Sequence, residues 1–135
     1  LVKEVEKGTC ISYGRTFVTK RKSKIATIPI GYADGYSRIL SGKVNVLING
    51  ESAPVVGRIC MDQCMIDVTD MKSDVKVGDE VVLIGRQGEK RIDIEQIASA
   101  MNTINYEAVC IIGKRIPRVY LCNGKVVSVL NYLLS

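Results

Sequence analysis

The chain consists largely of short runs of branched aliphatic residues, and turns that contain glycine separate these runs. The strongest hairpin signal is Asn49-Gly50, because both residues accept the positive φ angles of a tight two-residue turn. An alternating strand at residues 43–48 precedes this turn, and a return strand at residues 53–60 follows it. Asn123-Gly124 predicts a second hairpin of this kind near the end of the chain. Six or more short strands at close spacing predict a mainly β fold, an antiparallel or mixed barrel-like domain.

One segment departs from the strand pattern. Asp93 is a suitable N-cap, and Gln96 follows three residues later in the capping-box position. Four apolar residues recur at helical spacing behind this cap: Ile94, Ile97, Ala98 and Met101. The pattern predicts one short α-helix at about residues 93–101. Residues 103–107 are expected to form a polar link that presents Tyr106 near the end of that helix.

The length and charge of the chain restrict the class of protein. Its 135 residues suffice for one domain but not for an eight-stranded α/β barrel, which needs about 250 residues. The net charge is +5, and the densest basic cluster lies at residues 20–24. Such a run is more often a solvated turn than a nucleic-acid groove, and no aromatic residue is interleaved with it. An RNA-binding module is therefore the less favoured alternative.

The sequence contains no histidine and five cysteines. This excludes Ser-His and Cys-His nucleophiles and histidine-ligated metals within these residues. Cys60 and Cys64 are the nearest pair, but two further zinc ligands are missing, so no metal site is expected. Reduced thiols in a cytoplasmic protein are the favoured interpretation. Because the chain begins at Leu1, without an initiator methionine, and shows no signal peptide or membrane span, we expect a piece of a longer protein.

Two stretches carry candidate site residues. Residues 28–38 read Ile-Pro-Ile-Gly-Tyr-Ala-Asp-Gly-Tyr-Ser-Arg, in which the Asp-Gly turn would leave Tyr32, Tyr36 and Arg38 projecting as the rim of an anion or cofactor site. From this stretch alone, tyrosines that merely pack on a sheet are the favoured alternative. The second stretch is the corner at residues 58–62, where a polar break between strands can expose backbone N–H groups. An ordinary sheet corner explains that pattern equally well.

Taken together, these stretches resemble one family. The sequences Ile-Ser-Tyr-Gly at 11–14, the eleven residues at 28–38, Val-Gly-Arg-Ile-Cys-Met-Asp-Gln at 56–63 and Thr-Ile-Asn-Tyr-Glu at 103–107 resemble the C-terminal domain of alanine racemase, in the same order. Lys-Arg-Ile-Pro-Arg at 114–118 is a fifth match. The resemblance covers essentially all of residues 1–135. It implies a pyridoxal 5'-phosphate (PLP) enzyme that works as a head-to-tail homodimer.

The resemblance also implies that two domains supply different catalytic groups. The cofactor would be attached through a lysine of an N-terminal α/β barrel that is absent from these residues, and the fragment alone is expected to be inactive. Tyr13 would be the base that removes the α-proton of L-alanine when the enzyme interconverts L- and D-alanine. A phenol has an ordinary pKa near 10, so a phenol that acts as a base near neutral pH needs a pKa lowered by about 3. This corresponds to roughly 4 kcal/mol of preferential interaction with the tyrosinate. Burial alone raises the pKa of a phenol, so a nearby cation or hydrogen-bond donor is required.

Other residues acquire roles by the same resemblance. Met61 would bind the substrate carboxylate through its backbone N–H, and Tyr106 would donate to the cofactor phosphate. The narrow entry corridor would be lined by Tyr32, Arg38, Arg58, Asp62 and Ile104, whereas Tyr36 has no assigned role. We expect Tyr13, Tyr32 and Met61 to share one exposed face. A serine or broad-spectrum racemase, including the membrane-anchored type associated with vancomycin resistance, is the alternative within this class.

Overall fold

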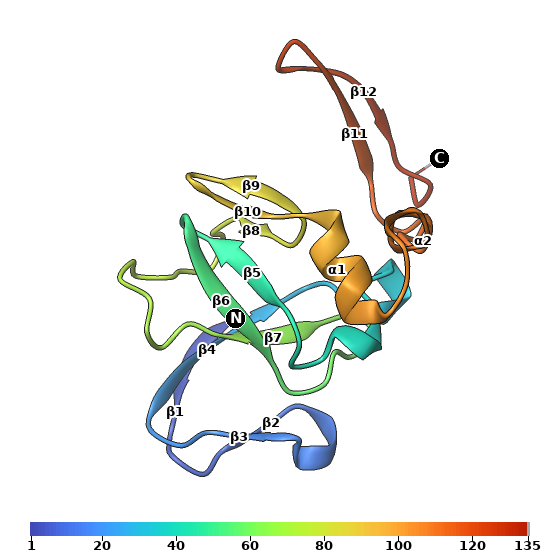
Figure 1. The fold of residues 1–135 in the computed structure, drawn as a ribbon. Helices are drawn as coiled ribbons and strands as arrows, with labels where there is room; N and C mark the ends of the chain where they lie inside the picture. The colour runs from blue at the N-terminus through green and yellow to red at the C-terminus, as the bar shows by residue number, and fades with distance from the viewer. Residues whose placement is uncertain (135) are drawn as a thin grey trace.

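The computed structural model describes residues 1–134 and is built around one antiparallel sheet (Figure 1). Its six strands follow the order β1-β4-β7-β6-β5-β8. The bounds in that order are Val2–Val5, Ser23–Ile28, Cys64–Asp67, Glu51–Val56, Asn45–Ile48 and Val81–Val82. The mainly β class that the sequence predicts is therefore confirmed. The sheet is strongly curved, since Val2 of β1 and Val81 of β8, the two end strands, line one cavity of about 660 Å³.

Three small hairpins accompany the sheet. They pair β2 (Cys10–Ile11) with β3 (Phe17–Val18), β9 (Gly85–Gln87) with β10 (Lys90–Ile92), and β11 (Arg118–Cys122) with β12 (Lys125–Leu130). Short 3-10 turns lie at η1 (Tyr13–Arg15), η2 (Tyr32–Asp34) and η3 (Arg38–Leu40). The turn chemistry predicted for the β5–β6 and β11–β12 hairpins is confirmed, because Asn49, Gly50, Asn123 and Gly124 all have positive φ angles.

Helix α1 (Ile94–Met101) forms where the sequence predicts it. The backbone N–H of Asp93 donates to Oε1 of Gln96 at 3.0 Å, as a capping box requires. Ile97 and Ala98 are buried, and Ile97 joins the main core with Leu40 of η3. Burial of this apolar stripe holds the helix against the sheet domain.

The polar link predicted after α1 is wrong beyond Ile104, because a second helix, α2 (Asn105–Cys110), starts there. Only Ala108 of α2 is buried, and the helix packs against α1. One buried residue produces no apolar periodicity, which is the signal on which a sequence-based helix prediction depends. Tyr106 consequently lies in the first turn of a helix and not in an extended link.

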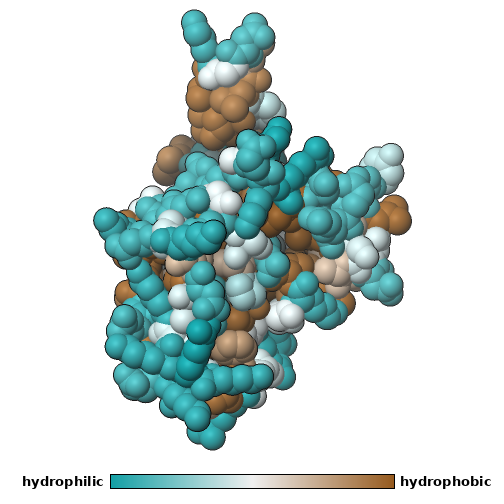
Figure 2. Space-filling model, turned by 60° about the vertical axis from the view of Figure 1, so that its left-hand side comes forward, coloured by the Kyte–Doolittle hydropathy of each residue, from teal (hydrophilic) through white to brown (hydrophobic). Residues whose placement is uncertain are grey.

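The β11–β12 hairpin projects away from the rest of the domain (Figure 1), and apolar side chains cover it (Figure 2). Its exposed apolar residues are Val119, Tyr120, Leu121, Val126, Val127 and Val129. A two-stranded hairpin is only marginally stable by itself in water. This surface is therefore suited to contact with another part of the protein.

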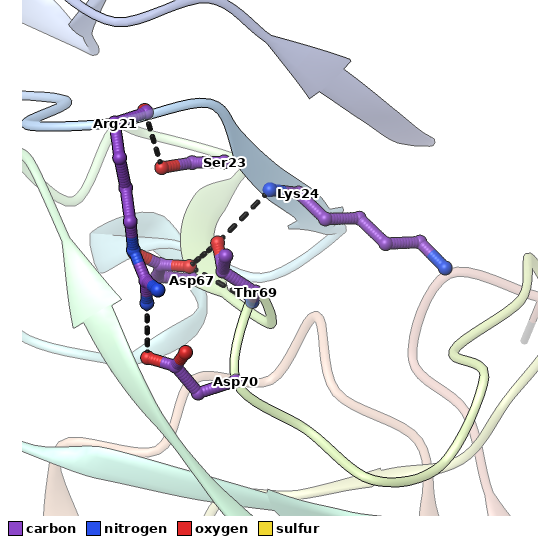
Figure 3. A network of polar contacts seen from close by, with 6 residues as sticks. All are labelled: Arg21, Ser23, Lys24, Asp67, Thr69 and Asp70. Atoms are coloured by element: carbon purple, nitrogen blue, oxygen red, sulfur yellow. Dashed lines mark hydrogen bonds and ion pairs between the residues drawn. The ribbon is translucent and has the colours of Figure 1, made fainter.

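The basic cluster at residues 20–24 is paired with carboxylates from neighbouring segments. Arg21 binds Asp70 (Figure 3), while Nζ of Lys22 lies 2.6 Å from Glu4 and Nζ of Lys24 lies 2.7 Å from Asp74. The backbone N–H of Lys24 also donates to Oγ1 of Thr69 at 2.9 Å. The predicted solvated turn is present at residues 20–22, which are exposed, but it is wrong for Ser23 and Lys24, which begin β4 with Ser23 buried. The ion pairs leave little of the cluster's charge for a phosphate backbone.

We expect the Arg21→Gln change to lower the free energy of unfolding by no more than about 1 kcal/mol, because exposed ion pairs contribute little. Both partners are exposed in this pair. Chemical denaturation of the wild-type and variant proteins at low and high salt measures the effect. A loss of several kcal/mol would show that the network orders the loop that carries Asp70.

Candidate functional site

One cavity of about 600 Å³ is lined by six of the eight predicted site residues: Tyr13, Tyr32, Arg38, Arg58, Met61 and Asp62. They come from three 3-10 turns and from the segment between β6 and β7. Tyr13, Tyr32 and Met61 are exposed, with 71%, 43% and 53% of their surface accessible. The expected common face of these three residues is therefore present.

The loop that carries Tyr13 has an unusual backbone. Ser12, Gly14 and Arg15 all have positive φ angles, of 64°, 73° and 51°. Side-chain-bearing residues rarely adopt this conformation, and such strain persists only where surrounding contacts impose it. One of these contacts is a hydrogen bond of 2.6 Å from Oγ of Ser12 to the carbonyl oxygen of Arg58. The loop is thereby fixed to the 58–62 corner with the Tyr13 phenol at the cavity.

The guanidinium of Arg58 packs against Gly14, next to Tyr13. A Cβ atom at position 14 would lie 3.1 Å from Nε of Arg58, so glycine permits this close approach. Among residues 1–134, neither Arg58 nor Arg38 forms an ion pair. Both positive charges are therefore available to an anion that enters the cavity.

The corner at Met61 is held by backbone contacts with η2. The N–H of Tyr32 donates to the carbonyl of Cys60, and the N–H of Ala33 donates to the carbonyl of Met61, each at 3.0 Å. A Cβ atom at Gly31 would lie 2.2 Å from the Cys60 oxygen, so the two segments touch without space for a side chain. The N–H of Met61 has no hydrogen-bond partner within residues 1–134. It is therefore a free donor on a backbone segment that lines the cavity.

The remaining two predicted residues lie outside this cavity lining. Tyr106 is 76% exposed on α2, and Ile104, just before α2, borders a separate shallow cavity beside α1. Cys60 also lines the cavity of Tyr13 and Met61, although its sequence position predicted no role for it, and its Sγ lies 3.5 Å from Oγ of Ser12. Its place in the Arg-Ile-Cys-Met-Asp-Gln motif was the signal that could have identified it.

The expectation that Tyr36 projects beside Tyr32 and Arg38 is wrong. Tyr36 is only 5% exposed and belongs to the main core. Burial raises the pKa of its phenol above the ordinary value, and burial likewise raises the pKa of Cys64 to about 12. Tyr36 is therefore a neutral packing residue, and the packing alternative holds for one of the two tyrosines.

Within residues 1–134, no three His, Cys, Asp or Glu side chains lie close enough together to hold a metal ion. No helix in the same range is both long and apolar enough to cross a membrane. All five cysteines are free thiols.

Comparison with known proteins identifies the family. The model of the family described as "Alanine racemase, C-terminal domain" matches residues 1–120. The chain belongs to this family. The resemblance seen in the sequence motifs is thus confirmed over most of the chain. As an alanine racemase C-terminal domain, the chain brings an exposed tyrosine, Met61 and two arginines that form no ion pair within residues 1–134 to one cavity.

Three relatives show how far the similarity extends. The alanine racemase of Clostridium novyi is 59% identical over 132 residues, which are 98% of this chain and 34% of that protein. The crystal structure of alanine racemase from Bacillus anthracis with bound L-Ala-P superposes with a TM-score of 0.93 at 48% identity, over 99% of this chain and 34% of that one. The crystal structure of alanine racemase from Bartonella henselae, with covalently bound pyridoxal phosphate, superposes with a TM-score of 0.83 at 40% identity. The match covers 89% of this chain and 32% of that one. This domain therefore spans about a third of the length of its relatives.

Proposed function

We propose that this domain supplies a proton-transferring tyrosine and an anion-binding corner to a PLP-dependent racemase that interconverts L- and D-alanine. The observation that carries the proposal is the shared cavity of Tyr13 and Met61, which also holds two unpaired guanidiniums. A carboxylate substrate needs hydrogen-bond donors, and proton abstraction needs a base on a defined side of the α-carbon. Residues that can supply hydrogen-bond donors and a residue that can supply the base line the same cavity of about 600 Å³.

Tyr13 is the proposed base for L-alanine. Its strained, anchored loop fixes the backbone of Tyr13 beside the cavity, and proton transfer over a short distance requires such positioning. The guanidinium of Arg58 packs on the adjacent Gly14 and lines the same cavity as Tyr13, so a cation shares the cavity with the phenol. A neighbouring cation stabilises negative charge that develops during a proton transfer. Because the chain contains no histidine, any histidine partner of Tyr13 belongs to another part of the protein.

The Met61 corner is the proposed site for the substrate carboxylate. A backbone N–H without a partner in residues 1–134, on a segment held against η2, can donate to an anion without reorganising. Arg38 and Arg58 add positive charge to the same cavity, and Tyr32 narrows it. This combination favours a small amino acid. The proposed entry corridor is lined by Tyr32, Arg38, Arg58, Asp62 and Ile104.

PLP, when bound, supplies the electron sink that makes the α-proton of an amino acid acidic. The donors of this domain fit an anionic, phosphate-bearing group, because Tyr106 presents an exposed phenol in the first turn of α2. The attachment lysine and the α/β barrel would lie in the two thirds of the relatives that this domain does not span. We place the protein in the cytoplasm, which five free thiols favour.

The position of Tyr106 bears on the proposed homodimer. Tyr106 and Ile104 lie outside the cavity of Tyr13 and Met61. In a head-to-tail dimer each C-terminal domain borders two active sites, so the two groups of residues would serve different sites. The apolar β11–β12 hairpin offers a further surface for the rest of the protein (Figure 2).

The full-length protein should racemise L-alanine in the presence of PLP, with D-serine formed more slowly from L-serine. Chiral chromatography of both reactions tests the substrate proposal. Equal or faster turnover of serine would favour the serine or broad-spectrum alternative. No turnover of either amino acid would contradict the proposed function.

Residues 1–135 alone should leave the chirality of L-alanine unchanged, even with added PLP. The lysine that attaches the cofactor is expected outside these residues, so no electron sink is held beside Tyr13. Polarimetry over a long incubation, with the full-length protein as the positive control, measures this. Turnover by residues 1–135 would show that the chemistry is contained in this domain.

A further inference from the structure

We infer that Arg115 is a positioning residue that clamps both sides of the Met61 corner. Arg115 lies in the turn between α2 and β11, far along the sequence from the cavity that it serves. One nitrogen, Nη2, lies 2.7 Å from Oδ1 of Asp62, and Nε lies 3.4 Å from Oδ1 of Asp34. The inference deepens the proposed function, on which the substrate part of its test rests.

The contact with Asp34 connects Arg115 to the backbone of η2. Asp34 is only 7% exposed, and a buried carboxylate requires compensating partners. Its second oxygen accepts the N–H of Gly31 at 2.9 Å, and its carbonyl accepts the N–H of Gly113 at 2.8 Å. Gly31 is the residue that touches the carbonyls of Cys60 and Met61. Arg115 is thus connected through Asp34 and Gly31 to the Met61 backbone.

The contact with Asp62 concerns charge. Asp62 follows Met61 directly and lines the cavity in which a substrate carboxylate would bind. An unpaired aspartate at this position would repel that carboxylate. Arg115 pairs with Asp62 and so neutralises it, and the same pairing raises the pKa of Arg115 above its ordinary value. The planar guanidinium can hold two carboxylates at once, which a lysine ammonium cannot do with the same geometry.

This arrangement predicts a specific pattern for the full-length enzyme. The Arg115→Gln change should raise KM for alanine about tenfold, because an unpaired Asp62 faces the substrate, with kcat within about threefold of wild type. Adding Asp62→Asn should return KM to about that of the Asp62→Asn single variant. Arg115→Lys should fall between Arg115→Gln and wild type. The matched control is Arg91→Gln, which removes an Arg–Asp pair at the start of α1.

Hydrogen-deuterium exchange of the same full-length variants supplies a readout that needs no turnover. Exchange at residues 31–34 and 58–64 should be faster in Arg115→Gln and unchanged in Arg91→Gln. A KM that Asp62→Asn does not restore, or unchanged exchange at both segments, would overturn the inference. If the wild-type enzyme fails to racemise alanine, the proposed function fails, while the exchange result still decides whether Arg115 clamps the corner.

Discussion

We expect the Tyr13→Phe change in the full-length enzyme to lower net racemisation of alanine by a factor on the order of 10² or more, because it removes the proposed proton acceptor for L-alanine. The equilibrium between the isomers is fixed by the substrates, so steady-state rates fall in both directions. Isotope exchange, in contrast, becomes asymmetric. The α-proton of D-alanine continues to exchange with solvent deuterium through the proposed lysine, while exchange of L-alanine collapses.

Proton NMR in deuterated buffer measures both exchange rates in one sample. The matched control is Tyr120→Phe, which removes an exposed phenol from β11, outside the cavity. Equal residual exchange of the two isomers, or racemisation near the wild-type rate, would mean that Tyr13 is a corridor or packing residue.

The Gly31→Ala change is expected to destabilise the protein by about 3 kcal/mol and to abolish substrate binding at the Met61 corner. The added Cβ would lie 2.2 Å from the carbonyl oxygen of Cys60 and 2.3 Å from that of Met61, and both atoms are backbone. Neither can move without shifting the segment that presents the Met61 N–H. Gly31 has a negative φ of -149°, so the effect is steric and not conformational.

Gly42→Ala is the complementary control. Gly42 has a φ of 69° and no atom within 4 Å of an added Cβ, so only the cost of the left-handed backbone, about 1 kcal/mol, is expected. Chemical denaturation and alanine binding of the two variants separate these causes. If Gly31→Ala is no more destabilising than Gly42→Ala, the contact between η2 and the Met61 corner is looser than the structure shows.

Sequence patterns predicted those parts of the fold that local chemistry determines. Asn49-Gly50 specifies its hairpin turn by itself, and Asp93 with Gln96 specifies the start of α1. Helix α2 was missed because Ala108 is its only buried residue, so its stability depends on packing against α1. Tyr36 was misplaced because turn residues on both sides of it gave no indication of which side chain enters the core.

The site was predicted through motifs and not through composition. Tyr13, Arg38 and Met61 are far apart in the sequence, and only the resemblance to a family indicated that they meet. Arg115 could not be assigned in this way, although it lies within a matched motif. Its role depends on two carboxylates, Asp34 and Asp62, that the fold brings together.

We propose that the Tyr13–Met61 cavity of one subunit completes the active site of its partner, and hybrid dimers test this proposal most directly. Subunits with Tyr13→Phe are combined with subunits that lack the PLP lysine, each preparation being inactive alone. If Tyr13 acts in the partner's site, each hybrid contains one site with both groups, and mixing in equal amounts restores about a quarter of wild-type racemisation. If the mixture stays as inactive as its components although hybrids form, Tyr13 does not act across the dimer and the proposed arrangement is contradicted.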